Sequence, residues 1–73
     1  MSQPARNVVQ LLETEELTVD VVARRLAYPA WRVYTFIEEA RAAGARVRAI
    51  PHPGDRTTFA VDGSSSMEDN RKR

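Results

Sequence analysis

Apolar residues in the first third of the chain recur three and four positions apart, which is the spacing of one helix face. A first helix is predicted from about Pro4 to Glu13, because proline is tolerated in a first turn. Thr14 to Glu16 would end it, and Leu17 would follow in a short extended link. The buried face would consist of Val8, Val9, Leu11 and Leu12.

A second helix is predicted from about Val19 to Leu26, directly after Thr18, whose hydroxyl makes it a good N-cap. Asp20 lies in its first turn, and Arg24 and Arg25 lie in its last turn, where each charge compensates the helix dipole. The buried stripe of this helix would be Val22, Ala23 and Leu26.

A third helix is predicted from Pro29 to Ala43, after a turn formed by residues 27–29. Pro29 has its φ already set for a first turn, and Gly44 is the residue type that commonly follows a helix end. The inner face would be Val33, Phe36, Ile37 and Ala40, with Ala43 as a further candidate. The residues facing outward, at least in part, would be Trp31, Arg32, Thr35, Glu38 and Glu39.

After Gly44 the apolar period changes from near four to two, which predicts strands. Residues 46–50 alternate, residues 51–56 form a loop rich in proline and glycine, and residues 57–61 return with Phe59 and Val61 inward. The following residues are small, polar or charged. We therefore predict one domain over residues 1–62 and a disordered polar tail over residues 63–73.

Size and composition narrow the class of protein. A chain of 73 residues holds one domain at most, and a hydrophobic content of 42% supports a compact fold. The absence of cysteine excludes disulfides and thiolate zinc sites. The apolar runs are too short for a membrane span, and the N-terminus lacks the basic and apolar regions of a signal peptide. We expect a cytoplasmic protein with no membrane partner.

Charge is distributed unevenly along the chain. Residues 1–23 carry one arginine and four acidic residues, whereas residues 24–56 carry seven arginines and three acidic residues. An acidic start beside a basic middle predicts a polarised surface. Arginine supplies nearly all of the positive charge. This suits contacts to phosphates and base edges, although a GC-rich genome would produce the same bias.

Two helices joined by a tight turn and followed by a hairpin have the order of a winged helix-turn-helix domain, an α+β fold with a two-stranded wing. Residues 17–26 and 33–44 resemble winged-helix regulators of the biotin-repressor and DeoR kind. In that family an alanine and a leucine of the second helix pack inside, here Ala23 and Leu26. The family pattern V-y-x-x-I-x-x-L-r-x-x-G is similar to the segment from Val33 through Ile37 to Gly44. The resemblance covers residues 8–61 and implies sequence-specific DNA binding in transcription control.

The resemblance makes residues 29–43 the reading helix in the major groove and residues 51–56 the wing on the backbone or minor groove. Such regulators usually begin the reading helix with Ser-Arg-Arg/Lys-Thr, where this chain has Pro29, Ala30, Trp31 and Arg32. Arg32 is then the strong base-edge donor, able to pair bidentately with guanine. Thr35 can contact a thymine methyl or a phosphate.

The aromatic and acidic residues of this segment have other interpretations. Trp31 can contact a DNA groove, anchor a protein partner or pack against the wing, and the sequence leaves these three open. Tyr28 and Tyr34 are interpreted as residues at the edge of the core, with hydrogen bonding to phosphate as the alternative. Glu38 and Glu39 are most simply a solvated face.

The hairpin adds arginines. Arg46 and Arg48 lie on the polar side of the first strand and Arg56 at the wing tip, where they either contact phosphate or minor groove or simply solubilise the strand. His52 is interpreted as a turn residue and not as a metal ligand or base. Residues 71–73 add either non-specific phosphate attraction or solubility. The predicted DNA-contacting residues are Ala30, Trp31, Arg32, Thr35, Arg46, Arg48 and Arg56.

No residue set points to catalysis, since the chain has no cysteine, one histidine and no glycine-rich phosphate loop. We expect no cofactor and no metal. The leading hypothesis is a small DNA-binding regulator of a phage or mobile element, acting on duplex DNA as a homodimer or side by side on repeated sites. The alternatives are a winged helix that binds a host or regulatory protein through Trp31, and an architectural, excisionase-like recombination-directionality factor.

Overall fold

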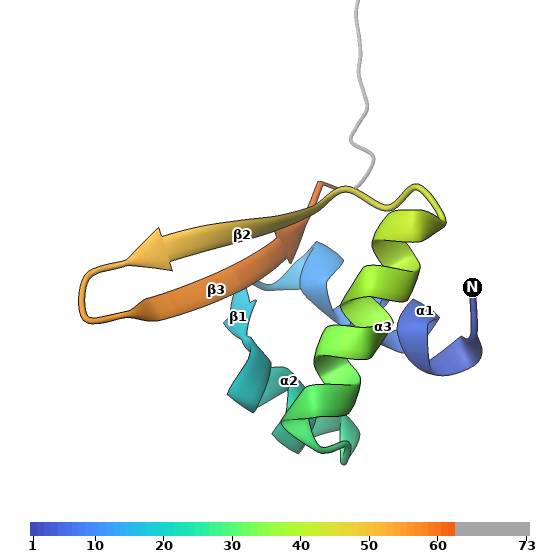
Figure 1. The fold of residues 1–73 in the computed structure, drawn as a ribbon, viewed down its shortest axis with the longest axis horizontal. Coiled ribbons are helices and arrows are strands. Elements are labelled where there is room, and N and C mark those ends of the chain that lie inside the picture. Colours follow the sequence, from blue (N-terminus) through green and yellow to red (C-terminus); the bar gives the residue numbers. More distant parts are fainter. Residues whose placement is uncertain (63–73) are drawn as a thin grey trace, which may run out of the picture.

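Three helices precede a β-hairpin, as the pattern of apolar residues predicts (Figure 1). The computed structural model describes residues 1–62, so the predicted tail over residues 63–73 lies outside the described residues. The elements are α1 (Gln3–Thr14), β1 (Leu17–Thr18), α2 (Val19–Leu26), α3 (Ala30–Ala42), β2 (Val47–His52) and β3 (Arg56–Val61). The fold is α+β with a winged-helix-like topology.

Local hydrogen bonds explain where the helices begin. The Ser2 hydroxyl accepts a bond from the backbone N–H of Ala5 at 3.3 Å, and Thr18 does the same for Val21 at 3.3 Å. Thr18 is therefore the N-cap of α2, as predicted. Pro29, predicted as the first residue of the third helix, is instead its N-cap, in extended backbone with no side-chain bond.

Left-handed backbone follows α2 and α3, whereas extended backbone at Glu15 follows α1. Ala27 follows α2 with φ of 61°, and the N–H of Tyr28 donates to the Ala23 carbonyl at 3.0 Å. This geometry closes the helix tightly enough for α3 to begin three residues later. Gly44 follows α3 with φ of 101°, in the conformation for which glycine was expected.

The hairpin belongs to a three-stranded antiparallel sheet with the order β1-β3-β2. Leu17, predicted to lie in an extended link, pairs with Phe59 of β3. The prediction of a loop over residues 51–56 was too long, because the strands continue until His52 pairs with Arg56. His52 is therefore a strand residue, and the interpretation as a turn residue was wrong. Pro51 fits this strand because β2 lies at the sheet edge, where a missing N–H costs no ladder bond.

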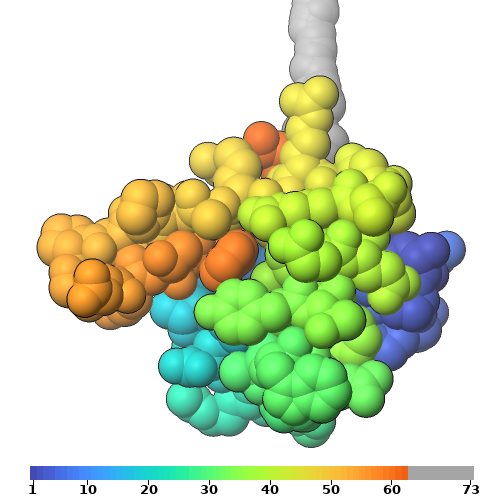
Figure 2. Space-filling model, viewed as in Figure 1, coloured from blue at the N-terminus to red at the C-terminus, as the bar shows by residue number. Residues whose placement is uncertain are grey.

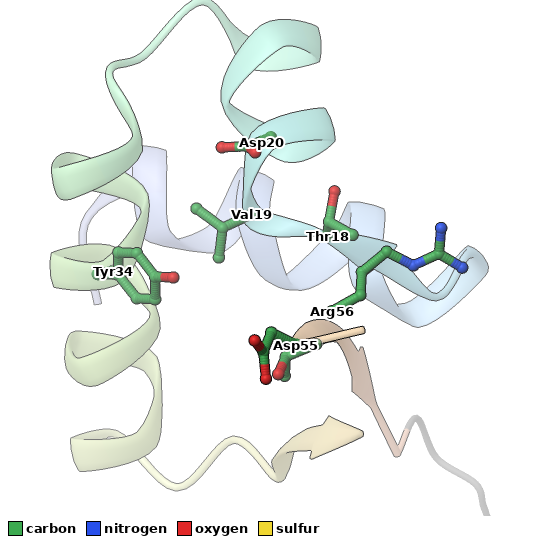
Figure 3. Close-up of a pocket in the computed structure, with 7 residues that line it drawn as sticks. Thr18, Val19, Asp20, Tyr34, Asp55 and Arg56 are labelled. Atoms are coloured by element: carbon green, nitrogen blue, oxygen red, sulfur yellow. The ribbon is translucent and has the colours of Figure 1, made fainter. Parts of the chain in front are cut away.

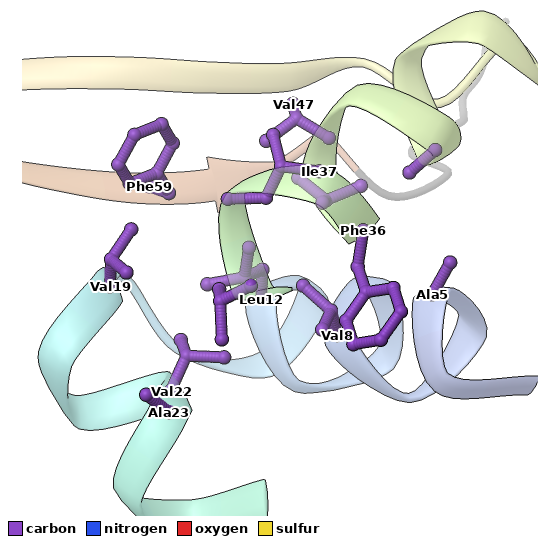
Figure 4. Packing of buried hydrophobic residues seen from close by; sticks show 13 residues of the cluster. Ala5, Val8, Leu12, Val19, Val22, Ala23, Phe36, Ile37, Val47 and Phe59 are labelled. Carbon is purple, nitrogen blue, oxygen red and sulfur yellow. The ribbon is translucent and has the colours of Figure 1, made fainter. Parts of the chain in front are cut away.

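The core lies between the helices and one face of the hairpin (Figure 4). Val8, Leu12, Val22 and Val33 are almost completely buried, and the predicted inner face of α3 is confirmed. Leu26 is half-buried and Ala43 is exposed, so both contribute less than predicted. The buried residues that the pattern did not indicate are Ala5, Val19 and Thr58, whereas Val47 is buried as the alternation of residues 46–50 predicts. Within residues 1–62, no helix is long and apolar enough to cross a membrane.

Candidate functional site

The outer face of α3 lies at the front of the molecule, and the hairpin extends to one side of it (Figures 1 and 2). Because Val33, Phe36, Ile37 and Ala40 occupy the inner face, the side chains opposite them are left to solvent. Trp31 is 66% exposed and Tyr34 is 54% exposed. A tryptophan this exposed is not packed against the wing, which removes one of its three interpretations.

Tyr34 makes the contact with the hairpin that was considered for Trp31. Its ring meets Phe59 edge-on, with the ring centres 6.4 Å apart. The predicted edge position is thus correct for one side of the ring, while the other side faces solvent. Its position three residues after Trp31 is a signal that both belong to neighbouring parts of one helix surface. Tyr34 was not among the predicted DNA-contacting residues.

Arg32 lies over two aromatic rings. Its guanidinium carbon is 5.7 Å from the centre of the Trp31 ring and 5.3 Å from the centre of the Phe36 ring. Both distances are in the range of cation–π attraction, which restricts the side chain without using its N–H donors. Within residues 1–62, none of the ion pairs includes Arg32. Its guanidinium is therefore available to an external acceptor.

The other two candidates at this end of α3 contribute less. The Thr35 hydroxyl donates to the Trp31 carbonyl at 3.1 Å, so its hydrogen is used inside the helix. Its oxygen can still accept a bond, and the residue is exposed. Ala30 is half-buried against the core. No side chain caps α3, and the N–H of Arg32 already donates to the Pro29 carbonyl. The N–H groups of Ala30 and Trp31 are therefore those that can bind an anion such as a phosphate oxygen.

A pocket of about 220 Å³ separates α3 from the wing tip (Figure 3). The labelled side chains come from the start of α2, from α3 and from the hairpin turn. Arg56 lines the pocket together with Tyr34, and its guanidinium points away from Tyr34 (Figure 3). Two carboxylates also line this pocket, so its interior repels phosphate and only its rim can attract a DNA backbone. The lining residues are Thr18, Val19, Asp20, Tyr34, Asp55, Arg56 and Thr57.

Arg46 and Arg48 are not brought together with the first turn of α3. They lie where the hairpin begins, at the end opposite Arg56. Because side chains alternate across a strand, Arg48 points to the opposite sheet face from its buried neighbour Val47. Its Nε donates to the Asp62 carboxylate at 2.8 Å, which compensates its charge.

His52 belongs to a polar cluster that joins the hairpin to the segment before β1. The Thr58 hydroxyl donates to the Glu16 carboxylate, and His52 Nε2 is 2.8 Å from the Thr58 oxygen. The Thr58 proton is already used, so Nε2 is assigned as the donor to Thr58. The hydrogen bond from Thr58 is the main cause that lowers the pKa of Glu16, and the hydrogen bond from His52 lowers it to a smaller extent. No group of residues that could hold a metal ion is found in the described part of the chain.

The two glutamates of α3 differ in their surroundings. Glu38 is exposed and pairs with Arg41 at 3.3 Å. Glu39, predicted to be solvated, is half-buried and accepts bonds from the backbone N–H and the hydroxyl of Ser2, which lower its pKa. One acidic charge is thus compensated on the helix surface and the other is turned toward the N-terminal segment. The outer face of α3 is consequently less acidic than its sequence suggests.

Comparison of the chain with protein-family models, with curated proteins and with solved structures found no match.

Proposed function

We propose that the domain binds duplex DNA, with the first turns of α3 in the major groove and the wing tip on the backbone or minor groove. The observation that carries this proposal is the exposed start of α3, where Arg32 projects beside an uncapped helix N-terminus. A guanidinium suits the O6 and N7 acceptors of guanine, and the first-turn N–H groups suit a phosphate. A role in transcription control, as in biotin-repressor and DeoR regulators, belongs to the same proposal.

The wing supports the proposal at a second point. Arg56 lies at the rim of the pocket that faces α3 and is outside the ion pairs of residues 1–62. Asp55 directly precedes Arg56 and lines the same pocket as Asp20, so these two carboxylates limit the attraction of this rim for phosphate. Arg56 then supplies phosphate attraction, whereas Arg32 supplies base discrimination.

The decisive experiment is selection of binding sites from random duplexes at two salt concentrations. We expect one enriched sequence containing guanine and an affinity that falls with salt. Arg32→Ala should weaken binding to that sequence by about 1–3 kcal/mol and relax its specificity. Arg6→Ala, on exposed α1 surface, is the matched control and should retain specificity. Failure to enrich any duplex, or binding that is independent of salt, contradicts the proposal.

A second candidate function is recognition of a protein partner, favoured by the exposed aromatic rings of Trp31 and Tyr34. In this case a purified regulatory partner would bind the protein equally well before and after nuclease treatment of the sample. The Trp31→Ala substitution would abolish this binding. A third candidate is an architectural role like that of excisionases. It predicts strong bending of the selected duplex, measured by the migration of circularly permuted fragments in a gel.

A further inference from the structure

We infer that Trp31 and Arg32 read one two-base step together, in which a pyrimidine carrying a C5-methyl group lies beside a guanine. This inference rests on the proposed DNA binding and specifies the DNA chemistry that α3 recognises. The methyl-bearing base is thymine or 5-methylcytosine, because both present the same group in the major groove.

The two side chains are close enough to contact neighbouring base pairs. They are consecutive in the first turn of α3, and the guanidinium of Arg32 lies over the Trp31 ring at 5.7 Å from its centre. The separation of stacked base pairs, roughly 3.4 Å, is well within the reach of two such long side chains. Trp31 therefore presents a flat apolar surface, and Arg32 presents hydrogen-bond donors, to adjacent base pairs of the major groove.

The exposed indole determines which group the first position prefers. Trp31 is the most exposed large hydrophobic residue of residues 1–62. The C5-methyl of a pyrimidine is the apolar group that a major groove offers, and covering it buries the indole surface as well. Unmethylated cytosine carries a hydrogen in place of this methyl group at C5, so it offers the indole less apolar surface.

The position of Arg32 determines the second base. A guanidinium held over rings keeps its N–H groups directed outward in its own plane, where they match the paired O6 and N7 acceptors of guanine. Adenine presents an amino donor in this place and is disfavoured. The remaining outer residues of α3 compete little, since Thr35 uses its hydrogen within the helix and Glu38 pairs with Arg41.

Base analogues in the selected duplex test both positions. Replacing thymine by deoxyuridine removes only the methyl group and should weaken binding of the wild type about 4-fold, as expected for one methyl group. Where the selected base is 5-methylcytosine, cytosine should have the same effect. Replacing guanine by 7-deazaguanine removes the N7 acceptor and should weaken binding by about 5-fold or more.

The variants make the assignment specific. Trp31→Ala should bind thymine and deoxyuridine duplexes equally while still discriminating against 7-deazaguanine. Arg32→Ala should show the reverse pattern. Tyr34→Phe keeps an exposed aromatic ring on the same helix and is the matched control that should discriminate like the wild type. Wild-type protein that tolerates deoxyuridine, or Trp31→Ala that still prefers thymine, overturns the inference.

Trp31 is also the single tryptophan of the chain, so its fluorescence reports directly on this position. We expect quenching by the selected duplex and weaker quenching by its deoxyuridine form. If selection yields no duplex and no DNA changes the emission, the proposed function itself is wrong. If DNA binds with unchanged emission, DNA binding stands and the inference about Trp31 fails.

Discussion

The hydroxyl of Thr58 donates a hydrogen bond to the carboxylate of Glu16, which lies 42 residues earlier in the chain. The bond joins β3 to the segment that connects α1 with β1, directly beside the pairing of Thr18 with Thr58. His52 adds a contact from β2 to the same two side chains. These three residues connect the half of the hairpin nearer the tip to the helical part of the domain. They therefore help to set where the wing tip lies relative to α3.

Thr58→Val should lower the free energy of unfolding by about 1 kcal/mol, because valine keeps the shape and loses the hydrogen bonds of a buried hydroxyl. The measurement is urea denaturation followed by circular dichroism. Thr57→Val is the matched control, since Thr57 is exposed on the neighbouring position of the same strand and should change the value by less than about 0.5 kcal/mol. Equal effects of the two substitutions would mean that the bond to Glu16 contributes nothing.

Stability should decrease as pH falls below the ordinary carboxyl pKa of 4.5, because folding lowers the pKa of Glu16. A carboxyl group whose pKa is lowered by folding stabilises the protein at pH values above its unfolded-state pKa. This contribution is lost as the pH falls and the carboxylate is protonated. Glu15 and Glu39 have lowered pKa values too and contribute in the same direction. Glu16→Gln should make the decrease of the urea midpoint below pH 4.5 shallower. A variant with the same pH profile as the wild type would show that Glu16 is not coupled to folding.

Ala27→Gly should stabilise the protein by about 1 kcal/mol, because a left-handed alanine is strained and glycine is not. The φ of Ala27 is 61°, directly after α2. Ala43→Gly is the matched control, since the φ of Ala43 is −88° and glycine relieves no strain there. Thermal unfolding should therefore give a higher Tm for the first variant and an unchanged or lower Tm for the second. A lower Tm for Ala27→Gly would contradict the left-handed helix end.

Leu12→Ala should destabilise the domain by about 2–5 kcal/mol, which is comparable with the total stability expected of so small a core. Leu12 is 2% exposed and packs among α1, α2 and α3. Leu26→Ala should cost clearly less, because Leu26 is half-buried despite its place in the predicted stripe. Chemical denaturation of both variants distinguishes the two sites. A larger loss at Leu26 would restore the sequence-based prediction.

Arg56→Ala should weaken binding to all duplexes alike and reduce the slope of log affinity against log salt by about 0.9, the value for one lost phosphate contact. Arg48→Ala should reduce the slope less, because Asp62 already compensates its charge and the side chain points away from α3. Affinities measured by fluorescence anisotropy at four salt concentrations give both slopes. The reverse order of the two effects would place the DNA backbone at the start of the hairpin and not at its tip.

Features that depend on neighbouring residues were predictable from the sequence. The helices follow from the spacing of apolar residues, and Thr18 and Gly44 mark a helix start and a helix end through local backbone chemistry. The alternation after Gly44 predicts the two strands of the hairpin. These signals are sufficient for the winged-helix-like fold, because each arises within a few residues of the chain.

Tertiary structure decided the features that join distant segments. Leu17 becomes a strand only because Phe59 is folded beside it, and His52 leaves the predicted turn because its partners are Glu16 and Thr58. Packing also decided which arginines remain available, since a carboxylate reaches Arg48 but none in residues 1–62 reaches Arg32. The sequence by itself determined the helices, the hairpin and their order through local periodicity. Only the folded chain determined the wing attachment and the exposed Trp31–Arg32 pair, because these depend on contacts between residues far apart in sequence or on what packing leaves uncovered.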